Sequence, residues 1–526
     1  MTSPRNFALP AHAAVAPQAE AMRPKLAILL TASVGCAMTV LDTNIVAIIL
    51  PTVARRLGAD FADVEWVIST YVLCFAALLL PAGSIADRFG RKRVFLGGIG
   101  LFAFASLCCG AAPTAFALYV ARALQGVGAA FLLAPALAII GHAFNDPAER
   151  AHAWSVWGGV MGITMVVAPI LGGVIAFLLG WRWAFYVNVP ICIGLGCAAL
   201  ALVPESRDDQ ARRLDPAGIV LFAGTMFGVT WGLIQGQAHG WLSPHAVAGF
   251  AGGLLSFACF CRVETRQARP MLDLSLFRSA PFIGAVLAMF AYAATAQVMA
   301  QLLPLYLQNG LGRAPLVAGI SMLPFALGML ILPYIGRRLG HFLASHHVLA
   351  LGLALVSAGD LLTSWAAYSG HAQIVVIGMA LLGSGGGLLN GETQKAIMGA
   401  IPKDRAGMAS GISTTARFSG ILLGFAMLSA ILGIAGRFTL ALHAQAALTQ
   451  DPENAQEFAQ LVVAGNTPTA LRLMGDGKAA LATQIAHQGY SAGFAAALLF
   501  AAMIAAIAAM LVAILMRRKQ KKEAAF

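Results

Sequence analysis

Charged residues are scarce in this chain. Asp, Glu, Lys and Arg make up only 11% of its 526 residues, whereas 59% are hydrophobic, and the mean hydropathy is +0.79. In an ordinary soluble domain about a quarter of the residues are charged. The composition therefore excludes a soluble globular protein of ordinary kind and indicates a chain that crosses a membrane many times.

Cysteine and histidine are missing from the spacings that metal sites need. The eight cysteines include no Cys-x-x-Cys pair and the eleven histidines no His-x-x-x-His, so we expect free thiols that pack, and no metal or cofactor. One Gly-x-Ser-x-Gly match, at 489–493, has the spacing of a hydrolase nucleophile elbow, but an apolar helix starts there and no strand precedes it. The chain is therefore not predicted to be an enzyme. An integral-membrane enzyme stays as the alternative from a different class.

Apolar runs long enough to cross a bilayer, about 20 residues each, fill most of the chain. Most Lys and Arg lie in the tails and in every second loop between these runs, which by the positive-inside rule places both termini in the cytoplasm. Basic residues spread over loops do not form the single basic face of a nucleic-acid binder, despite the net charge of +12. We predict fourteen spans, at 26–50, 64–86, 94–112, 116–140, 153–179, 184–203, 217–236, 246–264, 281–308, 315–335, 346–366, 372–398, 406–434 and 490–516.

Three segments lie outside these spans. Residues 1–24, rich in Ala and Pro, are predicted to form a disordered cytoplasmic tail, and residues 517–526 a basic cytoplasmic tail. Residues 435–489 form a long outer loop. Its two amphipathic stretches and its Gly-Asn-Thr-Pro turn favour short helices lying on the outer face over a folded domain.

The second and third spans are joined by one polar stretch, Gly83-Ser-Ile-Ala-Asp87-Arg88-Phe-Gly90-Arg91-Lys92-Arg93. A loop this short forces the two helices to be antiparallel, and its basic residues place it in the cytoplasm. Gly83 would allow close backbone approach, and Gly90 would end a helix in a left-handed turn. Asp87 would accept from a helix N-terminus or pair with Arg91. An ordinary positive-inside loop is the alternative interpretation.

Two charges of opposite sign lie at similar depth in the first and fourth spans. Asp42 lies about 25 Å along a helix that enters from the cytoplasm, roughly 12 Å below the outer surface. Arg122 lies about 10 Å along a helix that enters from outside. A charge inside the bilayer costs a few kcal/mol unless it is paired or faces a cavity. We therefore expect these residues to pair, either as a fixed ion pair that only orients the bundle or as a functional site.

The fifth span is dense in small residues, with the run Gly158-Gly159-Val-Met-Gly162-Ile-Thr-Met-Val-Val-Ala168-Pro169-Ile-Leu-Gly172-Gly173. Small residues let another helix approach closely, and Pro169 leaves a bend at the carbonyl that it frees. By itself such a pattern is common in membrane helices.

Taken together, these motifs resemble the major facilitator superfamily, and in particular its fourteen-helix drug:proton antiporters of the multidrug efflux type. The polar stretch resembles the signature between the second and third helices, which implies a gating loop made of Gly83, Asp87, Arg88, Gly90, Arg91 and Lys92. Leu41-Asp42-Thr43-Asn44 and Arg122-Ala-Leu-Gln125-Gly126 resemble the first- and fourth-helix motifs, which implies proton coupling through Asp42 and Arg122. The fifth span resembles the motif that separates antiporters from symporters, through Gly162, Pro169, Gly172 and Gly173, with Ala168 where the family usually has Gly.

The resemblance also suggests roles for charges elsewhere in the chain. An Asp87–Arg91 pair would favour the outward-facing form. Glu392 and Lys395 are three residues apart on one helix, so we expect a local pair near its inner end. Arg417 lies about 17 Å from the inner face, near the midplane, where transporters of this kind bind substrate. We expect Asp360 to be its partner, and an anionic group on the substrate is the alternative.

The sequence therefore predicts an all-α integral membrane protein with two six-helix bundles of the major facilitator fold, at 25–204 and 281–516, and two inserted central helices at 217–264. The resemblance implies a secondary active transporter of the bacterial inner membrane, a proton-coupled antiporter that exports small amphipathic or drug-like compounds by alternating access. A proton-coupled symporter of the same fold is the alternative. The proton gradient takes the place of a cofactor, and the expected partners are a small-molecule substrate, protons and the lipid bilayer. The sequence decides neither the substrate nor whether a periplasmic adaptor protein is needed.

Overall fold

The computed structural model describes residues 16–144, 146–207, 215–267, 274–340, 342–400, 406–448 and 451–523. These residues form helices and no β-strand, and they include 14 helical segments that are long and apolar enough to cross a membrane, which confirms the predicted count. The spans of the first half are α1 (Ala16–Leu57), α2 (Phe61–Phe89), α3 (Arg91–Ala111), α4 (Ala115–Ala143), α5 (Pro147–Leu178) and α6 (Trp183–Tyr186) with α7 (Asn188–Leu202). The next two are α8 (Pro216–His239) and α9 (Pro244–Arg266).

The later spans begin after a short 3-10 helix, η1 (Leu274–Arg278). One span combines α10 (Ala280–Tyr292), η2 (Ala293–Gln297), α11 (Val298–Leu305) and η3 (Tyr306–Gly310), and the next joins α12 (Pro315–Ser321) to α13 (Leu323–Leu339). The last four are α14 (Ser345–Ser369), α15 (Ala372–Gly399), α16 (Ala406–Ala447) and α19 (Ala479–Glu523). Between α16 and α19 lie α17 (Pro452–Val463), α18 (Thr467–Met474) and the 3-10 turn η5 (Asp476–Lys478).

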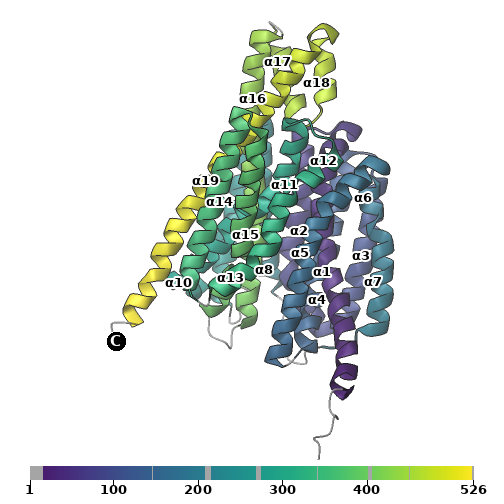
Figure 1. Cartoon of the computed structure of the whole chain (residues 1–526), viewed down its shortest axis with the longest axis vertical. Helices are drawn as coiled ribbons and strands as arrows, with labels where there is room; N and C mark the ends of the chain where they lie inside the picture. The colour runs from purple at the N-terminus through teal and green to yellow at the C-terminus, as the bar shows by residue number, and fades with distance from the viewer. Residues whose placement is uncertain are drawn as a thin grey trace, which may run out of the picture.

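The membrane helices form two bundles that stand side by side (Figure 1). The first bundle contains α1 to α7, in which α4 packs against α1, α2 and α3; the second contains α10 to α16 and α19, in which α14 packs against α15 and α19. The start of α1 and the end of α19 lie on one side of the molecule, which we call the terminal face. The opposite side, above which α17 and α18 project, is the cap face.

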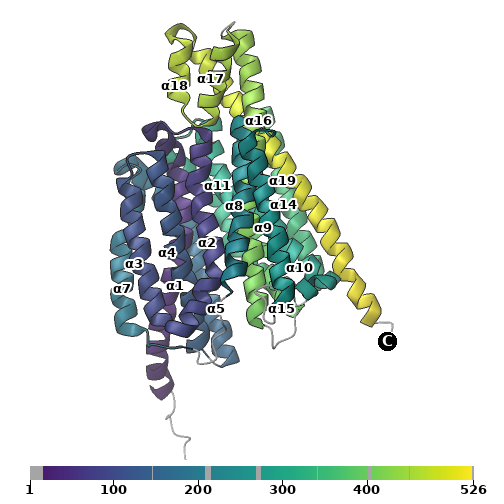
Figure 2. The same ribbon diagram turned by 180° about the vertical axis from the view of Figure 1, so that it is seen from behind.

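Helices α8 and α9 form a pair of their own (Figure 2). Besides packing against α9, α8 contacts α2 of the first bundle and α16 of the second. Trp66 of α2 lies with its ring 6.1 Å from that of Phe227 and 5.6 Å from that of Trp231, both on α8. The inserted pair therefore packs beside the junction of the two bundles.

The span that begins the second bundle is irregular. It contains two π-helical turns, η2 and η3, in which the backbone hydrogen bonds reach one residue further than in an α-helix. A π-helical turn re-aims the side chains that follow it and is frequent at functional sites. In this protein η2 supplies Gln297 and η3 supplies Gln308, and both side chains make the contacts described below.

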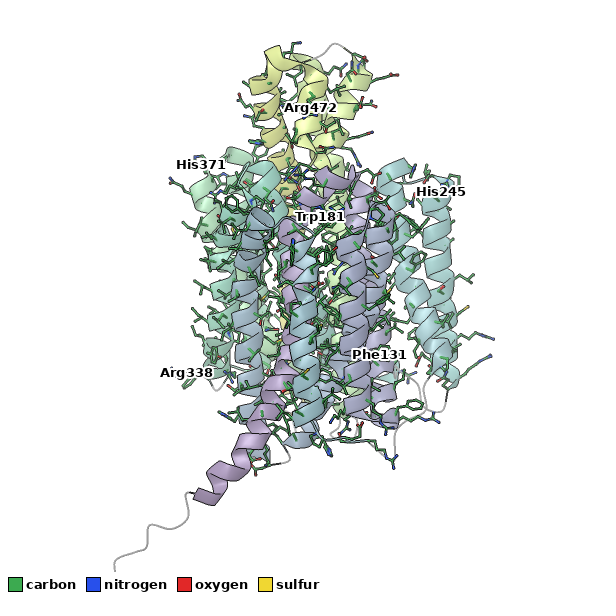
Figure 3. All side chains as sticks on the ribbon, turned by 90° about the vertical axis from the view of Figure 1, so that its right-hand side faces the viewer. Phe131, Trp181, His245, Arg338, His371 and Arg472 are labelled. Carbon is green, nitrogen blue, oxygen red and sulfur yellow. The ribbon has the colours of Figure 1, made fainter. Side chains whose placement is uncertain are left out.

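The outer loop predicted at 435–489 contains two short helices, as expected, but they pack into a small helical unit, which the prediction had disfavoured. Helix α16 continues to Ala447 and α19 begins at Ala479, and with α17 and α18 they form the cap, residues 435–489 (Figure 1). Phe458 and Ala470 are fully buried inside it. Hydropathy marks where the lipid-facing stretch ends, but no proline stops α16 or delays α19 there, so both helices run on. Figure 3 shows Arg472 on the cap, above Trp181 and His371, whereas Arg338 lies toward the terminal face.

The two predicted tails are also more helical than expected. Helix α1 begins at Ala16, and residues 1–15 of the predicted disordered tail lie outside the described residues. At the other end α19 continues through the basic residues to Glu523. Ala, Glu, Lys and Arg are strong helix formers, so both helices extend past the apolar runs that the sequence marks. The predicted free thiols are confirmed: all eight cysteines are free, and Cys36, Cys109 and Cys192 are buried in the first bundle.

Candidate functional site

The predicted pair between Asp42 and Arg122 is present in the first bundle. Arg122 Nη1 on α4 lies 2.5 Å from Asp42 Oδ2 on α1, and the two side chains are 1% and 0% exposed. The hydroxyl of Thr114 accepts from Ala117 N at 3.2 Å and so fixes the start of α4, two turns before Arg122. Both charges therefore lie at the same level of the bundle, as the depths estimated from the sequence predicted.

Neutral amides complete the surroundings of the carboxylate. Asp42 Oδ1 accepts from Gln125 Nε2 at 2.8 Å and from Asn188 Nδ2 at 2.9 Å. Gln125 Nε2 also donates to Ser106 Oγ at 2.9 Å. An ionised carboxylate only accepts hydrogen bonds, so Asp42 with three donors from three residues is well solvated by protein groups.

The guanidinium of Arg122 is equally well satisfied. Its Nη1 donates to Gln125 Oε1 at 2.7 Å, its Nε donates to the carbonyl of Val67 at 3.2 Å, and it lies 4.1 Å from the ring centre of Tyr71. These partners do not depend on Asp42, so Arg122 keeps several contacts if the carboxylate loses its charge. Sequence reasoning gave no role to Gln125, Asn188 or Ser106. The signal for Gln125 was its position three residues after Arg122, on the same helix face.

In the predicted gating loop, Asp87 and Arg91 do pair. Arg91 Nη2 lies 2.8 Å from Asp87 Oδ1, and the pair joins the end of α2 to the start of α3. Gly90 has φ +110°, the left-handed region that the sequence required of it. The expected close backbone approach at Gly83 is wrong, because a Cβ there would meet only the Cβ of Ala134, at 3.9 Å.

The N-terminus of α3 is capped by a residue that the sequence did not single out. Glu205, after α7, accepts from the backbone N of Lys92 at 3.0 Å and of Arg93 at 3.2 Å. Lys92 Nζ donates to the carbonyl of Leu200 at 2.7 Å, and Arg88 lies over the ring of Phe89, 5.6 Å from its centre. A carboxylate at a helix N-terminus is favourable, so Glu205 takes the capping role that we had considered for Asp87.

Helix α5 brings the two bundles together, as its small residues predicted. A Cβ on Gly173 would lie 2.8 Å from the carbonyl oxygen of Pro315 and from Cα of Leu316, and a Cβ on Gly319 of α12 would lie 2.3 Å from the carbonyl oxygen of Pro169. Because backbone meets backbone on both sides, no side chain fits in this contact. We call this contact of α5 with α12 the seam.

Further contacts between the bundles extend the seam, and α5 also packs closely against α1 of its own bundle. A Cβ on Gly162 would lie 2.4 Å from Leu330 Cδ1 of α13, in the second bundle. Within the first bundle, a Cβ on Gly172 would lie 3.1 Å from Cα of Ile45 on α1. Gln308 of η3 donates through Nε2 to the carbonyl of Ile48 on α1, at 2.7 Å. The bundles are thus in contact at the cap face. The Asp87–Arg91 pair is present in this structure, in which the seam is closed. The pair, which we expected to favour the outward-facing form, is therefore not restricted to a form that opens at the cap face.

In the second bundle the expected ion pair between Arg417 and Asp360 is not formed. Arg417 Nε donates to Gln297 Oε1 at 2.9 Å and Nη2 donates to Asn390 Oδ1 at 2.7 Å. Both carboxylate oxygens of Asp360 are buried without a hydrogen-bond partner among the described residues. Asp360 lies between Ser357 and Ser364, whose hydroxyls donate to carbonyls of α19, so it is on the α14 face that packs against α19 and away from Arg417.

Glu392 and Lys395 form the local pair predicted for α15, with Lys395 Nζ 3.2 Å from both carboxylate oxygens. Lys395 is half exposed and Glu392 is buried, so the lysine extends toward the surface from a buried carboxylate. The described residues contain no group of three His, Cys, Asp or Glu side chains that could hold a metal ion. The Gly-x-Ser-x-Gly match lies inside α19, with no strand before it.

A polytopic all-helical protein with two bundles, an inserted helix pair and charged residues buried between membrane helices is built as a membrane transporter. The profile of the Major Facilitator Superfamily matches residues 32–425, and the chain belongs to this superfamily.

The chain is similar to proteins named for drug resistance and export. It is 33% identical over 449 residues to the multidrug resistance protein Stp of Mycobacterium tuberculosis (strain CDC 1551 / Oshkosh), covering 85% of this chain and 83% of that protein. It is also 33% identical over 407 residues to the tetracenomycin C resistance and export protein of Streptomyces glaucescens, covering 77% of this chain and 75% of that protein. A similar solved structure is that of a bacterial homologue of the human lysosomal transporter Spinster, with a TM-score of 0.62, 16% identity, and coverage of 94% of this chain and 97% of that one.

Proposed function

We propose that this chain is a proton-coupled antiporter that exports small amphipathic or drug-like compounds by alternating access between two bundles, 25–204 and 281–516. The observation that carries the proposal is the buried pair of Asp42 and Arg122. A fixed structural pair would need only its two charges, whereas here each charge also has neutral partners that would stabilise it after the pair separates.

The pair is placed to control the seam through α1. A proton that binds Asp42 removes the charge that Arg122 contacts, and Arg122 retains Gln125, the Val67 carbonyl and the Tyr71 ring. Ile45, three residues after Asp42, contacts Gly172 of α5, and the carbonyl of Ile48 accepts from Gln308 of the second bundle. A shift of α1 on protonation therefore acts on both contacts within two helical turns.

The direction of transport is inferred from the relatives, which are named as resistance and export proteins. The close contact of α5 with the second bundle is compatible with either direction. A proton-coupled symporter stays the alternative, and the experiment below separates the two.

The proposed setting is a bacterial inner membrane with both termini in the cytoplasm, as the distribution of basic residues favours. The cap would then project outside the membrane and is the part of the chain that an adaptor protein would meet. The driving force is the proton gradient, and the proposed mechanism uses no cofactor.

The test uses purified protein in proteoliposomes with a pH-sensitive dye in the lumen and rhodamine 110, an amphipathic compound with a carboxylate, as the transported probe. For an antiporter, rhodamine 110 moving down its own gradient drives protons the opposite way; for a symporter, protons move with it. Asp42→Asn should abolish both proton movement and gradient-driven uptake, while Glu457→Gln, an exposed position on α17, should leave them unchanged. Equal gradient-driven transport by Asp42→Asn and wild type would refute the assignment of Asp42.

A further inference from the structure

Arg417 is a cation without a carboxylate partner among the described residues. Its two hydrogen bonds to described residues go to the neutral amide oxygens of Gln297 and Asn390, and no described carboxylate lies within 4.0 Å of it. Tyr292 adds the face of its ring, 5.8 Å from the guanidinium carbon. Arginine keeps its charge in proteins, so this site carries a permanent positive charge within the membrane-spanning part of α16.

Arg122 of the first bundle shows what a closed ion pair looks like. Arg122 is 1% exposed, contacts Asp42 directly and is surrounded by further partners. Arg417 is only half buried, as are Gln297 and Asn390. A charge at this depth is costly unless a counter-charge or a wet cavity compensates it. The partial exposure therefore leaves the guanidinium accessible to a mobile counter-charge.

The amides beside the guanidinium accept from it through their oxygens and can also donate. Arginine has no acceptor, so Gln297 and Asn390 must turn their oxygens toward it, which leaves the NH2 group of each amide as an additional donor. A site that offers a guanidinium and two amide NH2 groups matches an anion that only accepts hydrogen bonds. A carboxylate fits best, because the planar guanidinium can bind both of its oxygens.

The site also lies where the two bundles meet. Phe418, the next residue of α16, packs edge-on against Phe75 of α2, with 4.4 Å between ring centres. Gln297 is the last residue of the π-helical turn η2, and π-helical turns are frequent at functional sites. The helix that carries Arg417 therefore contacts the first bundle as well as its own, one residue further along the chain, as a substrate site in alternating access requires.

We propose that Arg417, Asn390 and Gln297 bind an anionic group, a carboxylate or a similarly acidic group, on the transported compound. This proposal rests on the proposed function as a transporter and specifies its substrate class: amphipathic compounds with an acidic group. The site is separate from Asp42 and Arg122, which lie in the first bundle and pair with each other.

The test compares two dyes that differ in one group. Rhodamine 110 has a free carboxylate, and rhodamine 123 is its methyl ester on the same cationic ring system. Binding to purified full-length protein is measured by fluorescence polarisation at equal pH on both sides, so no gradient is involved. We expect wild type to bind rhodamine 110 at least about tenfold more tightly, the fold-change typical of one hydrogen bond between charged groups.

Two variants, Arg417→Gln and Asn390→Asp, should remove the preference in different ways. Arg417→Gln removes the charge. As a comparison, Arg417→Lys should retain part of the preference because it keeps the charge without the planar fork. Asn390→Asp places a carboxylate next to Arg417 Nη2 and neutralises it in place, so this variant should lose the preference even if Arg417→Gln does not fold. Gln460→Glu, which adds the same negative charge at an exposed position of α17, should behave like wild type.

Equal affinity of wild type for the two dyes, or binding of neither, would overturn the proposal, as would an unchanged preference in Asn390→Asp. Uptake of rhodamine 110 driven by a pH gradient tests the proposed function separately. A binding preference without gradient-driven uptake would refute proton-coupled transport and leave the anion site standing. Gradient-driven uptake of both dyes without a binding preference would refute the anion site alone.

Discussion

Alanine at Gly173 should destabilise the closed seam selectively. The new Cβ would lie 2.8 Å from the carbonyl oxygen of Pro315 and from Cα of Leu316, about 0.6 Å short of the 3.4 Å at which ordinary contact begins. Both obstacles are backbone atoms, so no side-chain rotation relieves the overlap. Overpacking by one methyl group costs about 1–3 kcal/mol. Because the overlap exists only while the bundles touch, this cost falls on the closed form and shifts the ratio of open to closed forms about 5–150-fold.

The assay measures how often the seam opens. Each variant carries Ile48→Cys, at a position that is 0% exposed beside the seam, and the labelling rate with a water-soluble maleimide is followed peptide by peptide by mass spectrometry. The native thiol of Cys36, also 0% exposed, reports unfolding within the same sample. Gly194→Ala is the matched control, since nothing lies within 4 Å of a Cβ there. Equal labelling of position 48 in Gly173→Ala and Gly194→Ala would refute the assignment of this contact as the seam.

Three further predictions concern charged groups. Arg122→Ala should lower the free energy of unfolding by about 3–5 kcal/mol, because it leaves Asp42 without its counter-charge. Adding Asp42→Asn should restore much of the loss in a thermal-stability cycle, whereas additive losses would show that the two side chains are not coupled. Asp87→Asn should lower the free energy of unfolding by less than about 1 kcal/mol, since its pair with Arg91 is partly exposed. The variant should also leave maleimide labelling at position 48 unchanged, and faster labelling would show that the pair controls the seam. Asp360→Leu should raise the melting temperature and leave transport intact, because it removes a buried carboxyl group that has no hydrogen-bond partner among the described residues. Loss of transport in a folded variant would assign Asp360 a functional role.

The charged residues of the first bundle show which contacts can be predicted from the depth of a residue in the membrane. Asp42 and Arg122 could be paired from the sequence because each needed a counter-charge and both lie at one level. Gln125 and Asn188 complete the same network but carry no charge, so nothing in the sequence required them to have a partner inside the membrane. The network around the pair therefore became visible only when the helices were placed.

The predicted pair of Asp360 with Arg417 is wrong because it too was inferred from depth alone. Matching depth says nothing about which way a side chain points around its helix, and Asp360 points toward α19 while Arg417 points toward α15 and η2. The cap was missed for a different reason. Hydropathy locates the boundary of the lipid, but helix ends are set by capping and by proline, and α16 and α19 contain no proline near that boundary.

Because α16 and α19 continue into the cap, the molecule has a feature outside the membrane that would help to orient it in electron micrographs. Most of the chain is hidden by lipid or detergent, and its two bundles resemble each other in outline, which makes single particles hard to orient in electron micrographs. The cap rises from the second bundle alone and on one side of the membrane, so it breaks both ambiguities (Figure 1). An antibody fragment raised against its exposed surface, around Arg472, would be carried by the same two helices and would tilt with them as the transporter cycles.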